Sequence, residues 1–266
     1  MKDKIIELAR ACGEIIKGCK GAPLGISEKQ GHANFVTKYD KLVQDTLYRG
    51  LMEICPEAGF LGEEDNRGLK APFEGHSQVF IVDPIDGTSN FLKGFNHSAI
   101  SIALAQSDEP EKLNHELTFG LVYNPFTDEL FTASRGEGAY LNGEQIHSSP
   151  DPLEMSLVLF GTAPYNEKLH ETAFKNAKKM MKSCIDVRRL GSAALDLCYV
   201  ACGRAGLYFE PEIQPWDFAG GKIIVEEAGG FVTRWDGSPM SLMEPGSCTA
   251  HGSGIDSKRL REVLEI

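Results

Sequence analysis

The stretch at residues 79–91 limits the fold of this chain more than any other part of the sequence. Four apolar residues at 79–82 predict a buried strand, and Asp83 and Asp86 come directly after it. Because ligands of α/β proteins usually bind beyond the carboxyl ends of strands, these aspartates are expected at a binding site. Pro84 stiffens the step between them, so both carboxylates can reach one spot. On its own, the stretch is equally typical of a strand that ends in a turn.

The residues around Asp86 suit an anionic ligand. Gly87 lets the backbone approach a ligand closely, and the amides of Gly87 and Thr88 direct partial positive charge at a phosphate if they begin a helix or turn. The backbone carbonyl of Ile85 offers one more oxygen donor between the two aspartates. The stretch therefore predicts metal-binding oxygens beside phosphate-binding amides.

Two acidic residues elsewhere in the chain extend this pattern. Glu63 follows the apolar run at 59–61, and Asp217 follows Trp216 at the start of an apolar helix. Asp217 is also a candidate N-cap, a role that contributes about 1 kcal/mol, and Glu63 is also a candidate surface acid. Carboxylates are hard oxygen donors, which suit Mg²⁺ or Mn²⁺ rather than zinc.

The net charge of −11 is relevant to these carboxylates. It disfavours a nucleic-acid partner, and it repels a phosphorylated substrate unless bound cations reverse the field locally. An acidic surface that only maintains solubility is the alternative. The seven irregularly spaced cysteines indicate buried or free thiols in a reducing compartment, and neither a membrane span nor a signal peptide is visible. We therefore expect a cytoplasmic protein without a membrane partner.

The apolar periodicity predicts mixed runs of helices and strands rather than strict alternation. We expect an α/β fold of the mixed α+β kind in one domain, residues 1–266. The segment 148–152 is the best candidate for a boundary between possible subdomains 1–150 and 151–266, and Asn142-Gly143 predicts a hairpin turn. The predicted helices cover 4–19, 41–54, 167–183, 192–202, 217–228 and the residues from 256, and the predicted strands cover 78–82, 98–105, 119–123, 130–133, 138–141, 185–188, 205–209 and 230–234.

Taken together, the motifs resemble the inositol monophosphatase family of magnesium-dependent, lithium-sensitive phosphatases. The resemblance covers nearly the whole chain, and the combination of motifs is far more specific than any single one. It implies a layered αβαβα sandwich of the sugar-phosphatase type and a homodimer. The matching stretches are Gly62-Glu63-Glu64, Asp83-Pro-Ile-Asp86-Gly-Thr88, Gly120-Leu-Val-Tyr-Asn-Pro, Arg135-Gly-x-Gly-Ala-Tyr-x-Asn142-Gly, Trp216-Asp217-x-Ala219-Gly220 and Glu226-Glu-Ala-Gly-Gly230.

The resemblance also implies a ligand set for two Mg²⁺ ions. Glu63, Asp83 and the Ile85 carbonyl would hold the first ion, and Asp83, Asp86 and Asp217 would hold the second. A third, weakly held Mg²⁺ is expected near Glu63. The implied reaction is direct attack of a metal-activated water on phosphorus, without a phosphoenzyme.

Catalytic and substrate-binding roles carry over in the same way. Glu63 and Thr88 would orient the water and help to deprotonate it, with Asp86 as a further catalytic residue. The amides of Gly87 and Thr88 would hold phosphate oxygens.

The sugar side of the substrate would contact Asp86, Ala193 and Glu210. The competing interpretation is that Glu210 only ends a strand and has no functional role.

Three outer residues are weaker predictions from the resemblance. Lys29 and Asp40 fall where the family has outer-shell groups in an N-terminal loop, at about residues 22–40, and Arg188 belongs to a segment that borders the site. Asn34 stands where several members carry an acidic residue, which puts the surroundings of a third metal in doubt.

The predicted function is hydrolysis of myo-inositol monophosphates to inositol and phosphate. Ile85 in Asp-Pro-Ile-Asp, together with Glu210, favours the inositol branch of the superfamily. Relatives that hydrolyse fructose 1,6-bisphosphate, histidinol phosphate or 3′-phosphoadenosine 5′-phosphate have similar metal sites, so these substrates stay as alternatives. A non-enzymatic role as a regulatory binding partner is the hypothesis from a different class.

Overall fold

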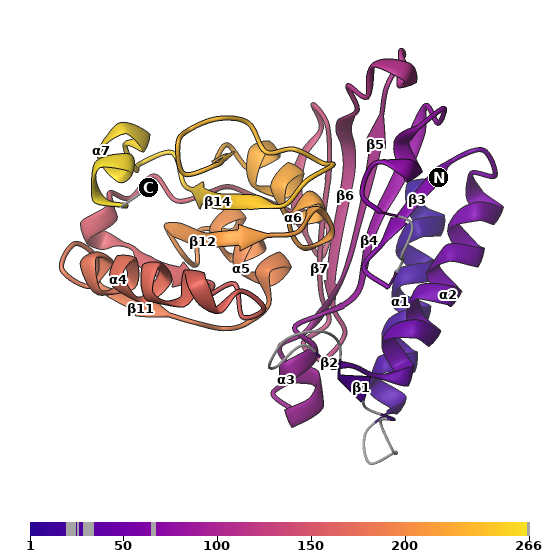
Figure 1. The fold of residues 1–266 in the computed structure, drawn as a ribbon, viewed down its shortest axis with the longest axis horizontal. Coiled ribbons are helices and arrows are strands. Elements are labelled where there is room, and N and C mark those ends of the chain that lie inside the picture. Colours follow the sequence, from indigo (N-terminus) through magenta and orange to yellow (C-terminus); the bar gives the residue numbers. More distant parts are fainter. Residues whose placement is uncertain (20–24, 26, 29–34, 65–67, 265–266) are drawn as a thin grey trace.

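The protein is arranged in five layers, with two sheets between three layers of helices (Figure 1). The structure is a computed structural model that describes residues 1–19, 25, 27–28, 35–64 and 68–264. The predicted residues Lys29 and Asn34 lie outside the described part. The mixed α+β class and the αβαβα layering are as the sequence and its resemblance led us to expect. The helices are α1 (Lys2–Gly18), α2 (Lys38–Ile54), α3 (Thr88–Lys93), α4 (His170–Met180), α5 (Ala193–Ala201), α6 (Pro215–Glu227) and α7 (Ser257–Val263).

The first sheet has seven strands in the order β3-β4-β5-β6-β7-β8-β9. Only β3 and β4 pair in parallel, and the other neighbours are antiparallel. Its strands are β3 (Gly59–Gly62), β4 (Gln78–Asp86), β5 (Ala99–Gln106), β6 (Glu116–Asn124), β7 (Glu129–Ser134), β8 (Gly138–Leu141) and β9 (Glu144–Ile146).

Both faces of this sheet are covered by helices, which explains the continuous apolar run of β4. Phe80 and Val82 pack with α1 and α2, whereas Val79 and Ile81 pack with α5 and α6 on the opposite face. Helices α1 and α2 present the apolar faces that the periodicity predicted, and α2 begins at a capping box made by Thr37 and Asp40.

The second sheet has five strands in the order β11-β10-β12-β14-β13. Strand β10 pairs in parallel with β11 and β12, and β14 pairs antiparallel with β12 and β13. Helices α5 and α6 fill the space between the two sheets, and α4 and α7 cover the far face (Figure 1). The strands are β10 (Leu157–Phe160), β11 (Asp186–Arg188), β12 (Leu207–Ile213), β13 (Phe231–Thr233) and β14 (Gly246–His251).

The short strands β1 (Ser27–Glu28) and β2 (Phe35–Val36) form a separate antiparallel pair. Residues of the first sheet come from 59–146 and those of the second from 157–251, with the segment 148–152 between them. The division into subdomains stays a prediction. No helix in the described part of the chain is both long and apolar enough to cross a membrane.

The structure differs from the predicted elements at several short strands. Strands β1, β2, β3, β9, β10 and β14 were not predicted, the helix α3 was considered only as a helix or turn after Asp86, and β4 extends four residues beyond the predicted 78–82. A four-residue apolar run such as β10 is too short to show a period. Asn142 and Gly143 both have positive φ and form the predicted turn, which joins β8 to β9.

Candidate metal centre

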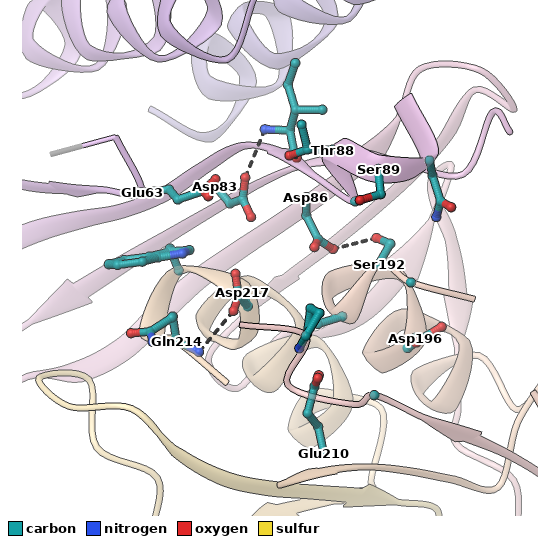
Figure 2. A pocket seen from close by; sticks show the side chains of 18 of the residues that line it. Glu63, Asp83, Asp86, Thr88, Ser89, Ser192, Asp196, Glu210, Gln214 and Asp217 are labelled. Carbon is teal, nitrogen blue, oxygen red and sulfur yellow. Dashed lines mark hydrogen bonds between the residues drawn. The ribbon is translucent and has the colours of Figure 1, made fainter. Parts of the chain in front are cut away.

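A cavity of about 540 Å³ lies where β4, α3, α5, α6 and β12 meet (Figure 2). Both sheets and the helix layer between them therefore contribute to its wall. Nearly all of the predicted site residues line it, although they come from four separate parts of the sequence. The predicted residues that line the cavity are Glu63, Asp83, Ile85, Asp86, Gly87, Thr88, Ala193, Glu210 and Asp217.

A bulge at the end of β4 directs its two aspartates to the same side. Asp83 pairs with Ser101 and Asp86 with Ala99, so β4 has one residue more than β5 between these pairs. In a regular strand, residues three apart point to opposite faces. The extra residue in the bulge brings Asp83 and Asp86 back to the same face of the sheet. Ile85, which lies between them, packs among the side chains that face α1 and α2. Pro84 is tolerated here because a bulge does not need its missing N–H group.

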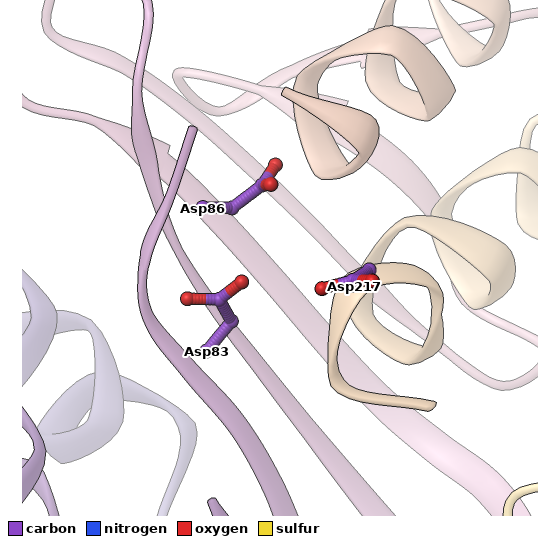
Figure 3. A group of neighbouring side chains, drawn as sticks. All are labelled: Asp83, Asp86 and Asp217. Carbon is purple, nitrogen blue, oxygen red and sulfur yellow. The ribbon is translucent and has the colours of Figure 1, made fainter. Parts of the chain in front are cut away.

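Asp83, Asp86 and Asp217 form a compact group of carboxylates (Figure 3). One oxygen from each lies within 4.8 Å of the others. Asp217 is in the first turn of α6, where its Oδ2 accepts the N–H of Gln214 at 3.0 Å. Gln214, rather than Asp217, is the N-cap residue, so Asp217 closes the capping box and also faces the cavity.

Hydrogen bonds fix the other two carboxylates of the group. Asp83 Oδ1 accepts the N–H of Ile85 at 2.9 Å. Asp86 Oδ2 accepts the hydroxyl of Ser192 and, at 2.8 Å, the N–H of Ala194. Since Ser192 is also the N-cap of α5, the start of this helix and the orientation of Asp86 depend on each other.

The cluster carries negative charge that the described side chains do not neutralise. Burial raises the pKa of Asp86 to about 6, although the hydrogen bond from Ser192 opposes the rise. Burial, and then the charge of Glu63, raise the pKa of Asp83 well above its usual value. Burial and the charge of Asp86 do the same to Asp217. Only oxygen donors converge here, which fits a hard divalent cation such as Mg²⁺.

Glu63 lies next to this cluster because β3 runs parallel to β4. Its N–H donates to the carbonyl of Val82 at 3.1 Å, and the following residue, Glu64, donates its N–H to Gln44 Oε1. This arrangement brings the Glu63 side chain to the cavity, as Figure 2 shows. Its role as a metal ligand stays a prediction.

Thr88 begins α3, with Gly87 as its N-cap in the left-handed conformation (φ 84°). The Thr88 hydroxyl lies 3.2 Å from the carbonyl oxygen of Ile85 and 3.4 Å from Asp40 Oδ1. Asp40 is buried, and its other oxygen accepts the backbone N–H of Thr37 at 2.7 Å. The predicted outer residue Asp40 is therefore connected to the site through Thr88.

Glu210 lies across the cavity from Asp83 (Figure 2), whereas Ala193 lies beside Asp86, which bonds to both of its chain neighbours. Glu210 Oε1 accepts the N–H of Ala163 at 2.7 Å, and Oε2 accepts the hydroxyl of Tyr208. Arg188 is exposed and pairs with Asp186, and its neighbour Arg189 lines the cavity instead. Among the cavity-lining residues that the structure describes, Arg189 is the one cationic side chain.

Sequence reasoning did not single out Ser192, Tyr165 or Tyr208, although all three line the cavity. Ser192 carried a usable signal, because a serine at the start of a predicted helix is a candidate N-cap. Tyr165 lies in a loop and Tyr208 in an ordinary apolar strand, where no local pattern marks them.

Three comparisons with known proteins agree on one family. A family model described as the inositol monophosphatase family matches residues 2–266. Nus factor SuhB of Vibrio cholerae is 39% identical over 249 residues, covering 92% of this chain and 88% of the relative. Inositol-1-monophosphatase of Rhizobium meliloti is 37% identical over 259 residues, with 97% and 90% coverage. The solved structure of the Thermotoga maritima IMPase has a TM-score of 0.83 at 30% identity, and the match covers 97% of this chain and 94% of that chain.

Proposed function

Because the chain belongs to the inositol monophosphatase family, we propose that it is a magnesium-dependent phosphomonoesterase that releases phosphate from myo-inositol monophosphates. The observation that carries this proposal is the group of three carboxylates within 4.8 Å, in a cavity whose other end contains Glu210. A cation-binding end and a hydroxyl-binding end in one cavity suit a phosphorylated polyol.

The metal would be held by Asp83, Asp86 and Asp217, with Glu63 and the Ile85 carbonyl completing the sites for two Mg²⁺ ions and a weaker third ion near Glu63. Bound there, Mg²⁺ supplies Lewis-acid stabilisation of charge on oxygen and lowers the pKa of water. The raised pKa values of Asp83, Asp86 and Asp217 support this assignment, because a divalent cation would offset their mutual repulsion.

The attacking water would be oriented by Thr88 and Glu63. The Thr88 hydroxyl directs its proton toward the Ile85 carbonyl and Asp40, which leaves its lone pairs to accept a hydrogen bond from water. Glu63 can then take the proton from that water as it attacks phosphorus in line. The amides of Gly87 and Thr88, at the start of α3, would hold the non-bridging oxygens.

The sugar would bind on the Glu210 side of the cavity. Each oxygen of Glu210 already accepts one hydrogen bond, and a carboxylate has lone pairs for more. Substrate hydroxyls can fill these positions, and Asp86 and Ala193, which also line the cavity, would contact the sugar as well.

The test is phosphate release from inositol 1-phosphate with and without Mg²⁺. Asp86→Asn and Asp217→Asn should each lower kcat at least a hundredfold, whereas Asp45→Asn, at an exposed position of α2, should leave it unchanged. Near-wild-type turnover in both cluster variants would show that the assignment is wrong.

A bisphosphatase acting on fructose 1,6-bisphosphate or 3′-phosphoadenosine 5′-phosphate is the alternative within the same chemistry. Arg189 favours it, since this cation lies at the cavity, where a second phosphate could bind. Comparing kcat/KM for these two substrates and inositol 1-phosphate separates the options.

A second candidate function is that of a regulatory binding protein. It is favoured by the name of the Vibrio cholerae relative, which is called a Nus factor rather than a phosphatase. A partner protein whose binding survives replacement of Asp83, Asp86 and Asp217 would support it.

We also propose a cytoplasmic homodimer that binds neither nucleic acid nor membranes, which light scattering and nucleic-acid titration can check.

A further inference from the structure

The loop between β10 and α4 brings a tyrosine to the acidic end of the cavity. Pro164 and Tyr165 of this loop line the cavity, and Tyr165 is 54% exposed. Desolvation raises the pKa of the Tyr165 phenol, and the charges of Glu63 and Asp217 raise it further. The phenol therefore lies close to the carboxylates, while part of the residue is in contact with solvent.

The backbone before Tyr165 is held in a conformation that favours glycine. Ala163 has a φ of 46° and is almost completely buried. Its N–H donates to Glu210 Oε1 at 2.7 Å, and its carbonyl accepts the N–H of Asn166 at 2.9 Å. Such a conformation persists only where surrounding contacts determine it, so the position of Tyr165 is set by the protein rather than by chance.

The Tyr165 hydroxyl has no hydrogen-bond partner within the described part of the chain. Burial raises the pKa of Asp196 and Glu210, and the charge of Arg189 opposes both rises, so this cation lies on the Glu210 side of the cavity. The acidic end thus contains a neutral O–H donor and no described arginine or lysine. A neutral donor that keeps its proton can contact a phosphate oxygen without competing with metal for the carboxylates.

We propose that Tyr165 is a substrate-binding residue, whose hydroxyl donates a hydrogen bond to a non-bridging oxygen of the substrate phosphate. Ala163, through its bond to Glu210, is the positioning residue that fixes the loop. This assignment rests on the proposed function, because it requires a phosphate ester in the cavity.

The test compares Tyr165→Phe with Tyr48→Phe, which makes the same change at an exposed tyrosine of α2 that does not line the cavity. Tyr165→Phe should lower kcat/KM about tenfold for both inositol 1-phosphate and p-nitrophenyl phosphate, since a hydrogen bond to a charged group is lost. The inhibition constant of inorganic phosphate should rise by a similar factor. Mg²⁺ affinity, measured by calorimetry, should stay within twofold of the wild type, and Tyr48→Phe should change none of these values.

Other outcomes overturn the assignment. A loss limited to inositol 1-phosphate would place the hydroxyl on the leaving group, and a parallel loss of Mg²⁺ affinity would mean that Tyr165 acts through the metal. Full activity of Tyr165→Phe combined with loss in Tyr165→Ala would assign the role to the ring. If the wild-type protein hydrolyses no ester, the proposed function fails, and binding of inorganic phosphate to the Mg²⁺-loaded protein then tests Tyr165 independently.

Discussion

At the scale of single residues, the site depends on close approaches that leave no room for a side chain. A Cβ atom added at Gly161 would lie 2.1 Å from the carboxyl carbon of Glu210. Glu210 is buried and bonded to Ala163 and Tyr208, so it cannot move away without losing these partners. Gly161 therefore helps to position Glu210, the predicted contact to the sugar.

Gly161→Ala should consequently displace Glu210. We expect KM for inositol 1-phosphate to rise about tenfold, with the Mg²⁺ activation constant unchanged, because the cluster is at the other end of the cavity. Overpacking of this kind also costs about 1–3 kcal/mol of stability. Steady-state kinetics over a range of Mg²⁺ concentrations measure both constants. Gly18→Ala, where a Cβ meets nothing within 4 Å, is the control, and an equal effect there would contradict the interpretation.

At the scale of elements, the first turn of α5 links folding to the metal site. Ser192 accepts the N–H of Leu195 as the N-cap and donates its hydroxyl to Asp86. One side chain therefore stabilises the helix and also orients a predicted metal ligand.

Ser192→Ala should show both effects. We expect a loss of about 1 kcal/mol of unfolding free energy, together with weaker Mg²⁺ binding and a lower kcat. Asp256→Ala removes the corresponding cap of α7, far from the cavity, and should reduce stability by a similar amount with unchanged Mg²⁺ affinity. Denaturant unfolding and calorimetry give the two quantities. If Ser192→Ala binds Mg²⁺ as the wild type does, the proposed link is wrong.

The elements also show what sequence alone could predict. Helices α1 and α2 were predictable because their apolar faces repeat over 17 residues each. Strand β14 (Gly246–His251) was not, because it contains glycine, serine and histidine and owes its place to pairing with β12 and β13. Asp83 and Asp86 could be recognised as a pair because they lie only three residues apart in the chain. The contact of Asp86 with Ser192 spans 106 residues and carries no local signal.

At the scale of the whole molecule, buried and half-buried acidic groups join the two sheets and the helix layer between them. Asp83 and Asp86 come from the first sheet, Asp217 from the helix layer and Glu210 from the second sheet. The pKa of each is raised, chiefly by burial. Without a cation, the ionised cluster therefore opposes the packing of these layers.

The stability of the metal-free protein should accordingly fall as pH rises from about 5.5 to 8. A carboxyl whose pKa is higher in the folded than in the unfolded state binds more protons when folded, so raising the pH through the folded pKa favours unfolding. For Asp86, the rise from 3.8 to about 6 corresponds to about 3 kcal/mol in all, of which about 1 kcal/mol, or about 2–4 °C in Tm, falls between pH 5.5 and 8. Mg²⁺ should reverse the trend by raising Tm more at pH 8 than at pH 5.5, since protons compete with it at the lower pH. Thermal unfolding with EDTA or Mg²⁺ at both pH values measures this.

Asp86→Asn is the matched variant and should reduce the pH dependence of the metal-free Tm. If the metal-free Tm is the same at both pH values in the wild type and in the variant, the carboxylates of the cluster do not repel one another enough to oppose folding.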